Sequence, residues 1–192
     1  MTSPVKRLRA ETSALVVIDV QDRLLAKIPT AAALVANAGF LMDVAALLDV
    51  PVRATEQYPK GLGPTTPKLA RRLPADLPAK TAFSCCGAGT FLEELEMLRR
   101  PSVVLVGMET HVCVAQTALD LLAAGLHVYL AVDALAARGR LDHDTAIRRL
   151  EQAGAVPTTV EAVAFEWTGD ASHPKFKAVS GLVIARSAAA AT

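Results

Sequence analysis

Short apolar runs alternate with longer amphipathic stretches along most of this chain. The run Ala14 to Asp19 is continuous and β-branched, which is typical of a strand buried on both faces of a parallel sheet. Ser102 to Gly107 and His127 to Val132 are predicted as further strands, and Ala31 to Asp49 as a helix that Pro51 stops. Strands that alternate with helices require crossover connections. The pattern therefore predicts an α/β fold, with three α/β/α layers and a mostly parallel, doubly wound sheet.

The remaining segments complete this pattern. Strands are expected over Pro51 to Thr55, Leu77 to Phe83 and Ala155 to Thr158, and helices over Gly89 to Arg99, Val112 to Ala124, Asp142 to Ala153, Thr159 to Phe165 and Ser172 to Ile184. Tyr58 to Pro67 contains three prolines and two glycines, so it is predicted to be a loop. No repeat or linker divides the chain. We therefore expect one domain over residues 1–184 and a short low-complexity tail over 185–192.

Composition narrows the possible partners. The 20 basic and 19 acidic residues give a net charge of +1, so electrostatics favour neither nucleic acid nor a membrane surface, and a small molecule is the expected partner. Hydrophobic residues make up 52% of the chain, an excess that predicts burial of some surface in a homo-oligomer. The three cysteines form no Cys-x-x-Cys motif, and the apolar stretch near the N-terminus is too short for a signal peptide. A reducing, cytoplasmic location is expected.

Three chemically useful residues fall at or beside strand ends: Asp19, Lys80 and Cys113. Ligands of open parallel sheets bind beyond the carboxyl ends of the strands. Cys113 opens a predicted helix, where unpaired amides and the helix dipole favour a thiolate. Asp19 could accept the thiol proton, and Lys80 could hold the thiolate and lower its pKa.

Each of these residues also has a purely structural interpretation. Cys113 could be a small buried hydrophobe, Asp19 a turn former and Lys80 a solvated surface residue. Two other functions stay open as well. One is a redox or thiol-sensing protein in which Cys85 or Cys86 resolves an oxidised Cys113. The other is a catalytically idle binding protein.

Three segments in this order resemble the signature regions of the isochorismatase-like cysteine hydrolase superfamily, which includes nicotinamidases, N-carbamoylsarcosine amidases and true isochorismatases. They are Leu15 to Leu24, Ala79 to Cys85 and Val106 to Val114. The similarity extends over nearly the whole chain. Thr55 to Gly63 and Glu166 to Asp170 look most like isochorismatase-domain proteins and uncharacterised bacterial hydrolases.

The resemblance implies a role for each residue of the trio. Asp19 would match the proton acceptor of the family, Lys80 its catalytic lysine and Cys113 its nucleophile. It also implies a cis peptide bond between Met108 and Glu109, so that the backbone N–H groups of Glu109 and Cys113 form an oxyanion hole. The implied activity is hydrolysis of an amide or carbamoyl C–N bond through a thioester.

Two departures limit which activity is expected. Nicotinamidases hold a metal with an Asp-x-His pattern in the region that matches Thr55 to Gln57, and neither residue type stands there. The histidines are scattered (His111, His127, His143 and His173), so we expect no metal and no cofactor. True isochorismatases cleave a vinyl ether without a cysteine nucleophile, so Cys113 favours C–N hydrolysis.

Candidate substrate-binding residues lie near the same strand ends. They are Gln21, Leu25, Gln57, Tyr58, Phe83 and Ser84. Each could equally serve packing or a turn, because polar and aromatic groups near strand ends do both. Thr110 is expected to be a helix N-cap.

Overall fold

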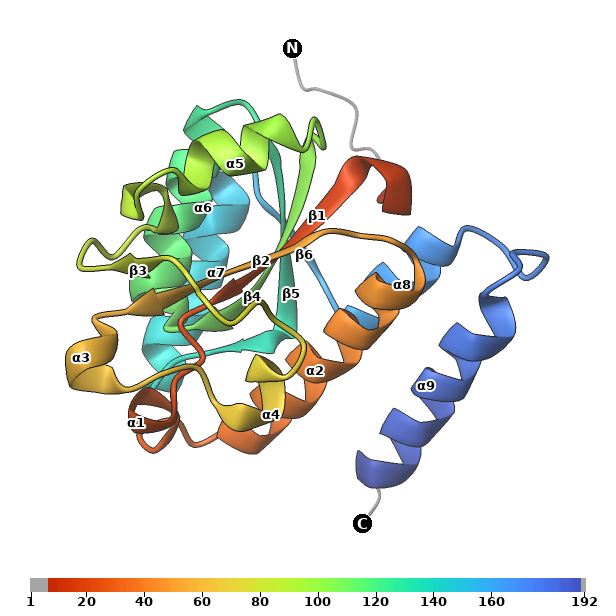
Figure 1. Ribbon diagram of the computed structural model, residues 1–192, viewed down its shortest axis with the longest axis horizontal. Coiled ribbons are helices and arrows are strands. Elements are labelled where there is room, and N and C mark those ends of the chain that lie inside the picture. Colours follow the sequence, from red (N-terminus) through yellow and green to blue (C-terminus); the bar gives the residue numbers. More distant parts are fainter. Residues whose placement is uncertain (1–6, 191–192) are drawn as a thin grey trace.

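A parallel sheet of six strands lies between two layers of helices (Figure 1). The computed structural model describes residues 7–190, so the first six residues of the predicted domain and the last two of the predicted tail lie outside it. The strands are β1 (Ser13–Ile18), β2 (Val52–Gln57), β3 (Ala79–Lys80), β4 (Ser102–Met108), β5 (His127–Ala136) and β6 (Val156–Thr158). Their order in space is β3-β2-β1-β4-β5-β6, and all neighbours are parallel. The predicted fold class is confirmed.

The strand order creates a switch point between β1 and β4. The chain first moves outward from β1 to β2 and β3, and then returns to the other side of β1 to form β4, β5 and β6. The connections after β1 and β4 therefore leave in opposite directions, and open α/β sheets bind ligands at the carboxyl ends of the strands at such a point. Any ligand of this sheet is expected there.

Helices cover both faces of the sheet. On one face of the sheet lie α2 (Ala31–Leu47) and α8 (Val160–Thr168), with α4 (Pro67–Ala70) packed against α2 and α9 (Phe176–Ala190) packed outside α2 and α8. On the other face lie α5 (Phe91–Met97), α6 (Ala115–Ala123) and α7 (Arg140–Gln152) (Figure 1). Along β1, Leu15 and Val17 join the first core cluster, whereas Val16 and Ile18 join the second. Burial on both faces explains why β1 is apolar without alternation.

Short helical turns occupy several connections. They are η1 (Ala10–Thr12), α1 (Asp22–Leu25), α3 (Pro59–Leu62), η2 (Cys85–Gly87) and the π-helical turn η3 (Thr110–Val114). The prediction that Tyr58 to Pro67 is only a loop is wrong, because α3 lies within it and α4 begins at Pro67. Proline at the first helical position has the required φ and needs no amide hydrogen, so it starts both helices.

Two strands differ most from their predicted bounds. The strand expected over Leu77 to Phe83 is reduced to β3, because the chain after Lys80 turns so that the carbonyls of Ala82 and Phe83 accept from the Lys80 ammonium. β5 does not end at Val132, as predicted, but continues to Ala136.

The C-terminal helix is longer than expected. Helix α9 continues through Ala190, so most of the predicted tail is helical, as a run of strong helix formers allows. Val179 anchors α9 in the core, and Arg186 pairs with Asp133 of β5 and Glu161 of α8. None of the helices within residues 7–190 has the length and hydropathy that a membrane span requires.

Candidate active site

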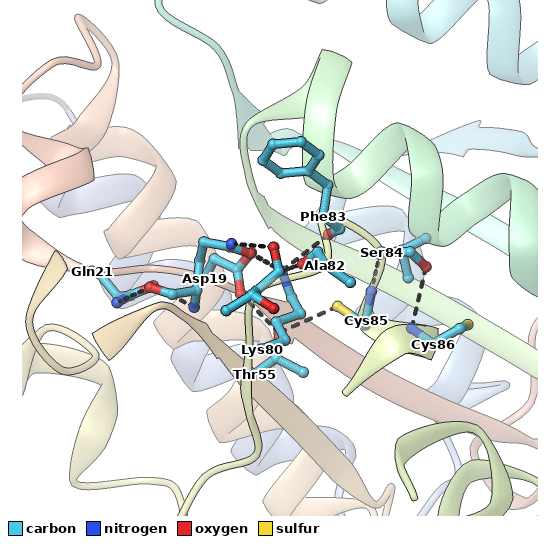
Figure 2. A network of polar contacts seen from close by, with 12 residues as sticks. Asp19, Gln21, Thr55, Lys80, Ala82, Phe83, Ser84, Cys85 and Cys86 are labelled. Atoms are coloured by element: carbon cyan, nitrogen blue, oxygen red, sulfur yellow. Dashed lines mark hydrogen bonds and ion pairs between the residues drawn. The ribbon is translucent and has the colours of Figure 1, made fainter. Parts of the chain in front are cut away.

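Asp19 lies at the switch point, directly after β1. Its φ of 52° turns the chain sharply, a conformation that aspartate tolerates better than most residues. The side chain is fully buried, and its two oxygens have different partners. Oδ2 accepts from Lys80 Nζ at 2.6 Å and Oδ1 accepts from Thr55 Oγ1 at 2.9 Å (Figure 2). The carboxylate is thus fixed in orientation by two neighbouring strands.

Lys80 is buried at the end of β3 and uses all of its donors within the protein. Its ammonium group donates to Asp19, to Gln57 Oε1 at 2.6 Å and to the backbone oxygens of Phe83 at 3.0 Å and Ala82 at 3.3 Å. An ammonium group has three hydrogens, so these acceptors occupy them. Lys80 therefore orients and neutralises Asp19 and has no hydrogen left for a ligand.

Cys113 lies in the π-helical turn η3, which separates β4 from α6. The Val114 amide donates to the Glu109 carbonyl at 3.2 Å, five residues back, so the turn is wider than an α-helical one. The predicted helix over Val112 to Ala124 therefore begins with this turn and becomes α-helical only at Ala115. Cys113 is 6% exposed, and its thiol interacts with the Asp19 carboxylate.

The backbone before this turn has two special features. The peptide bond between Met108 and Glu109 is cis. Just before it, Gly107 has a φ of 122°, and a Cβ there would lie 2.2 Å from the carbonyl oxygen of Ile18. Only glycine allows β4 to approach β1 this closely, so Gly107 brings the Cys113 turn next to Asp19.

The electrostatics of the site keep Cys113 protonated. Burial raises the pKa of the Cys113 thiol to about 12, with the negative charge of Asp19 adding to the rise and Lys80 opposing it. Burial also raises the pKa of Asp19 above its ordinary value, against the opposing effects of Lys80, Cys113 and Thr55. The expectation that the surroundings lower the pKa of Cys113 is wrong, because desolvation outweighs the attraction of Lys80. At rest, the site pairs a thiol with a carboxylate.

Three of the predicted substrate-binding residues have their polar atoms bonded within the protein. Gln21 is fully buried, donates to the carbonyls of Gln57 and Gly63 and accepts from the Gln57 amide at 2.8 Å. The side chain of Gln57 accepts from Lys80 and donates to the Thr81 carbonyl. Ser84 caps η2 by accepting from the Cys86 amide. These contacts show that all three residues help to build the site.

The other three candidates supply apolar surface. Leu25 is buried in the core beside α2, whereas Tyr58 and Phe83 are each 52% exposed. The Tyr58 amide donates to the Lys80 carbonyl, and the Phe83 carbonyl accepts from Lys80, so both aromatic residues adjoin the polar network. In Figure 2 the Phe83 ring points away from that network. Tyr58 and Phe83 are therefore available for contact with a ligand.

The loop between β5 and α7 and the first turn of α7 brace the turn that contains Cys113. Thr110 Oγ1 lies 2.9 Å from His143 Nδ1 of α7, so Thr110 does not cap a helix as expected. Burial lowers the pKa of His143, which keeps the ring neutral. Arg138 donates to Glu109 Oε2 at 2.9 Å from its side chain and at 3.2 Å from its backbone. Sequence reasoning missed these contacts because they join separate elements.

A cavity of about 400 Å³ opens beside this loop. It lies between α2, the end of β5 and the start of α7, and Leu34, Asn37, Leu135, Arg138 and His143 are among its lining residues. Within residues 7–190, no three His, Cys, Asp or Glu side chains come together as a metal site would require. Cys85, Cys86 and Cys113 are free thiols.

Comparison with known proteins shows which family this chain belongs to. The family model of the isochorismatase domain matches residues 13–162. The chain is 39% identical over 178 residues to isochorismatase domain-containing protein 2A of Mus musculus, which covers 92% of this chain and 85% of the relative. It is 40% identical over 180 residues to the Homo sapiens isochorismatase domain-containing protein 2, with the same coverage of 92% and 85%.

Solved structures agree with this assignment. The MAR1 ribonuclease from Caenorhabditis elegans superposes with a TM-score of 0.87 at 41% identity, over 93% of each chain. YcaC from Escherichia coli, at 24% identity, shares the fold with a TM-score of 0.82, over 97% of this chain and 99% of that one. With the family model covering most of its length and relatives matching nearly all of it, the chain belongs to the isochorismatase-domain family.

Proposed function

We propose that this protein is a cysteine hydrolase that cleaves an amide or carbamoyl C–N bond of a small molecule through a thioester intermediate. The observation that carries the proposal is the fully buried Asp19 carboxylate, which Lys80 holds from β3 at 2.6 Å and whose charge acts on the buried Cys113 thiol. These residues come from three remote segments of the chain. A nucleophile, a base and a cation that orients the base form a standard set for acyl transfer.

In the first half of the reaction, Asp19 acts as the general base. It accepts the thiol proton while Cys113 Sγ attacks the carbonyl carbon of the substrate. The backbone N–H groups of Glu109 and Cys113 donate to the oxyanion of the tetrahedral intermediate, a contribution worth about 3 kcal/mol per donor in other enzymes. The C–N bond then breaks as Asp19 delivers the proton to the departing amine, and the acyl group stays on sulfur as a thioester.

In the second half, water replaces the amine. Asp19 takes a proton from the water as its oxygen attacks the thioester carbonyl. The C–S bond breaks, the carboxylic or carbamic acid leaves, and the Cys113 sulfur recovers its proton from Asp19. Lys80 keeps its contact with the carboxylate throughout, so the base starts each half-reaction in the same place.

The protonation state at rest favours hydrolysis over a redox function. Peroxide reacts with thiolates, and the pKa of Cys113 is raised to about 12 and that of Cys85 to about 11. Neither thiol is therefore activated for oxidation when no substrate is bound. Asp19 is positioned to remove the Cys113 proton. It does so only when the sulfur lone pair can form a bond to an electrophilic carbon.

The lining of the site points to a small, weakly polar substrate. The amides of Gln21 and Gln57 and the ammonium of Lys80 are bonded to protein partners, whereas Tyr58 and Phe83 offer aromatic surface. The C. elegans relative is described as a ribonuclease. Here the near-neutral chain and the enclosed Lys80 give little to attract a polyanion. A carbonyl carbon is therefore the favoured target.

We also propose that the protein is a cytoplasmic homo-oligomer that takes neither nucleic acid nor a membrane as its partner. YcaC of E. coli is described as an octameric hydrolase of unknown specificity. On this chain the large apolar side chains of Met97, Leu141 and Ile184 are 80%, 76% and 67% exposed, which favours their burial between subunits. Light scattering of the purified protein measures its mass, and a monomer at micromolar concentration would contradict this part.

The test of the hydrolase is a panel of small amides and carbamoyl compounds, with RNA as a further arm. Amine or ammonia release is measured for wild type and for Cys113→Ala and Cys113→Ser in parallel. We expect both variants to keep the fold by circular dichroism and to lose at least about 10³-fold in kcat/KM. Intact mass spectrometry of the wild type should show the acyl group on Cys113. Wild-type rates in either variant would contradict the mechanism.

A further inference from the structure

A buried chain of polar side chains begins at Oδ1 of Asp19, the carboxylate oxygen that Lys80 does not contact. Thr55 Oγ1 lies 2.9 Å from Asp19 Oδ1, and Cys85 Sγ lies 3.2 Å from the same Thr55 oxygen (Figure 2). Thr55 and Cys85 are both buried, so bulk water does not compete for these contacts. The hydrolysis described above uses neither residue.

The direction of each hydrogen bond follows from counting protons. A threonine hydroxyl has one hydrogen to donate, and a carboxylate only accepts. Thr55 must therefore donate to Asp19, and its oxygen can only accept from Cys85. Cys85 must then be a protonated thiol, and burial raises its pKa to about 11, which keeps the proton on sulfur at neutral pH. The bonds run from Cys85 to Thr55 to Asp19.

Cys85 is itself held in place by the element that follows the Cys113 turn. Its backbone N–H donates to Thr117 Oγ1 of α6 at 2.9 Å, and Thr117 is fully buried. The η2 turn thus fixes the Cys85 thiol between α6 and the end of β2. A continuous polar path connects the helix behind Cys113 with the carboxylate in front of it.

We propose that Cys85 is a positioning residue for the general base: its thiol holds the Thr55 hydroxyl in the rotamer that donates to Asp19, and so fixes the carboxylate toward Cys113. This inference rests on the proposed role of Asp19. Hydrogen bonds in series polarise one another where the dielectric is low. Loss of the Cys85 donor removes the partner that fixes the Thr55 hydroxyl, and the Asp19 contact weakens with it.

This chain of hydrogen bonds also predicts how the activity depends on pH. The groups that face Asp19 are Lys80 from β3, Thr55 from β2 and Cys113 from the π-helical turn, with Cys85 behind Thr55. Burial raises the pKa of Asp19, and the bond from Thr55 opposes that rise. Weakening this bond raises the pKa of Asp19 further. The acid limb of kcat/KM should then move to higher pH, with the rate recovered under alkaline conditions.

The experiment compares Thr55→Val, Cys85→Ala and Cys85→Ser, with Cys86→Ser as the matched control at a neighbouring cysteine. The readouts are kcat/KM against pH on the amide found by the panel and a ¹³C NMR titration of the Asp19 carboxyl. At neutral pH we expect kcat/KM to fall about tenfold in Thr55→Val and about threefold in Cys85→Ala. Cys85→Ser keeps a donor and should lose less than Cys85→Ala, and Cys86→Ser should match the wild type.

A role in core packing alone predicts the opposite order. Cys85 lies in the apolar cluster between the sheet and α5 and α6, so a serine there would be worse than alanine if packing alone mattered. That order, or an unchanged pKa of Asp19 in both Thr55→Val and Cys85→Ala, would overturn the proposal. If Cys85→Ala fails to fold, Cys85→Val supplies similar volume without a donor, and the same outcomes apply.

The NMR readout separates this inference from the proposed function. It needs no turnover, because it measures the ionisation of Asp19 directly. If the wild type hydrolyses no amide but the pKa of Asp19 rises in Thr55→Val and Cys85→Ala more than in Cys85→Ser, the hydrolase proposal fails and the positioning by Cys85 stands. If the wild type is active and the pKa of Asp19 does not respond, the hydrolase stands and Cys85 has no positioning role.

Discussion

The two halves of the site are held together by different means. On the side of β1, β2 and β3, charged and amide side chains are buried and saturate one another, with the Lys80 ammonium bonded to Asp19, Gln57 and two carbonyls. On the side of β4, the path of the backbone positions Cys113, through the close approach at Gly107 and the π-helical turn. Side chains brace this second half at two places, the part-buried contact of Thr110 with His143 and the pair of Glu109 and Arg138 at its rim.

This difference predicts how each half responds to substitution. A buried charge whose partner is removed keeps its desolvation cost, so single changes beside Asp19 should be severe. The rim pair of Arg138 and Glu109 is different, because the Arg138 side chain is 62% exposed and water can replace it. We therefore expect substitutions beside Asp19 to have much larger effects than substitutions at the rim beside Glu109.

The largest effect is expected for Lys80→Met. Removing the ammonium group leaves the Asp19 carboxylate buried without its charge partner, which should reduce the free energy of unfolding by about 3 kcal/mol at neutral pH. Urea unfolding followed by circular dichroism measures the loss. The double variant Asp19→Asn with Lys80→Met serves as the control and should be more stable than Lys80→Met alone. Wild-type stability of Lys80→Met would remove the proposed contrast between the halves.

An intermediate effect is expected in alkali. The folded-state pKa values of Cys113 and Cys85 are raised to about 12 and about 11 from 9.0. The folded protein therefore holds protons that the unfolded chain releases. Their contribution to stability is complete below pH 9 and is lost as the pH rises through the folded-state values, with a slope that approaches about 1.36 kcal/mol per pH unit for each thiol.

Urea titrations at several pH values above neutrality test this slope. The free energy of unfolding of the wild type should fall more steeply with pH than that of Cys113→Ser, which lacks one of the two buried thiols. Equal slopes for the two proteins would show that Cys113 ionises normally in the folded state. That result would contradict the raised pKa of Cys113 and the contribution of its buried thiol to stability.

The smallest effect is expected for Arg138→Ala. The variant loses one exposed ion pair with Glu109, so stability should change by less than about 1 kcal/mol, and kcat/KM should fall no more than about threefold. Arg140→Ala is a matched control, because Arg140 lies in the same region but pairs with Asp144 rather than Glu109. A loss of activity as large as that of Lys80→Met would mean that the rim is as important as the buried pair.

The sequence predicts the sheet and the meeting of Asp19, Lys80 and Cys113 for a clear physical reason. Strands buried on both faces have an unmistakable apolar pattern, and the residues that follow parallel strands share one edge of the sheet. The sequence pattern predicts less well which groups each side chain will bond to. Gln21 and Gln57 stand at the expected places, yet their amides bond to backbone groups of loops whose path the sequence does not specify.

The ionisation of Cys113 shows the same limit. A cysteine at a predicted helix start suggests a stabilised thiolate, but the turn is π-helical and the sulfur is almost completely enclosed. Burial therefore decides the direction of the pKa, and burial depends on how η2, α6 and β1 pack. The sequence does not indicate a positioning role for Thr55 or Cys85, because a threonine at a strand end and a small buried cysteine are both ordinary components of α/β cores. The one signal is that Cys85 ends the same segment that contains Lys80.

In the proposed mechanism Cys113 keeps its proton until a substrate is bound, so inhibitors should be selected for their fit to the site before their reactivity. General alkylating agents react with thiolates that are already present. They would therefore label the more exposed Cys86 or no cysteine at all. An electrophile whose carbonyl oxygen reaches the amides of Glu109 and Cys113 would induce the sulfur to react. Screening libraries should therefore contain mild warheads on compact aromatic or aliphatic scaffolds.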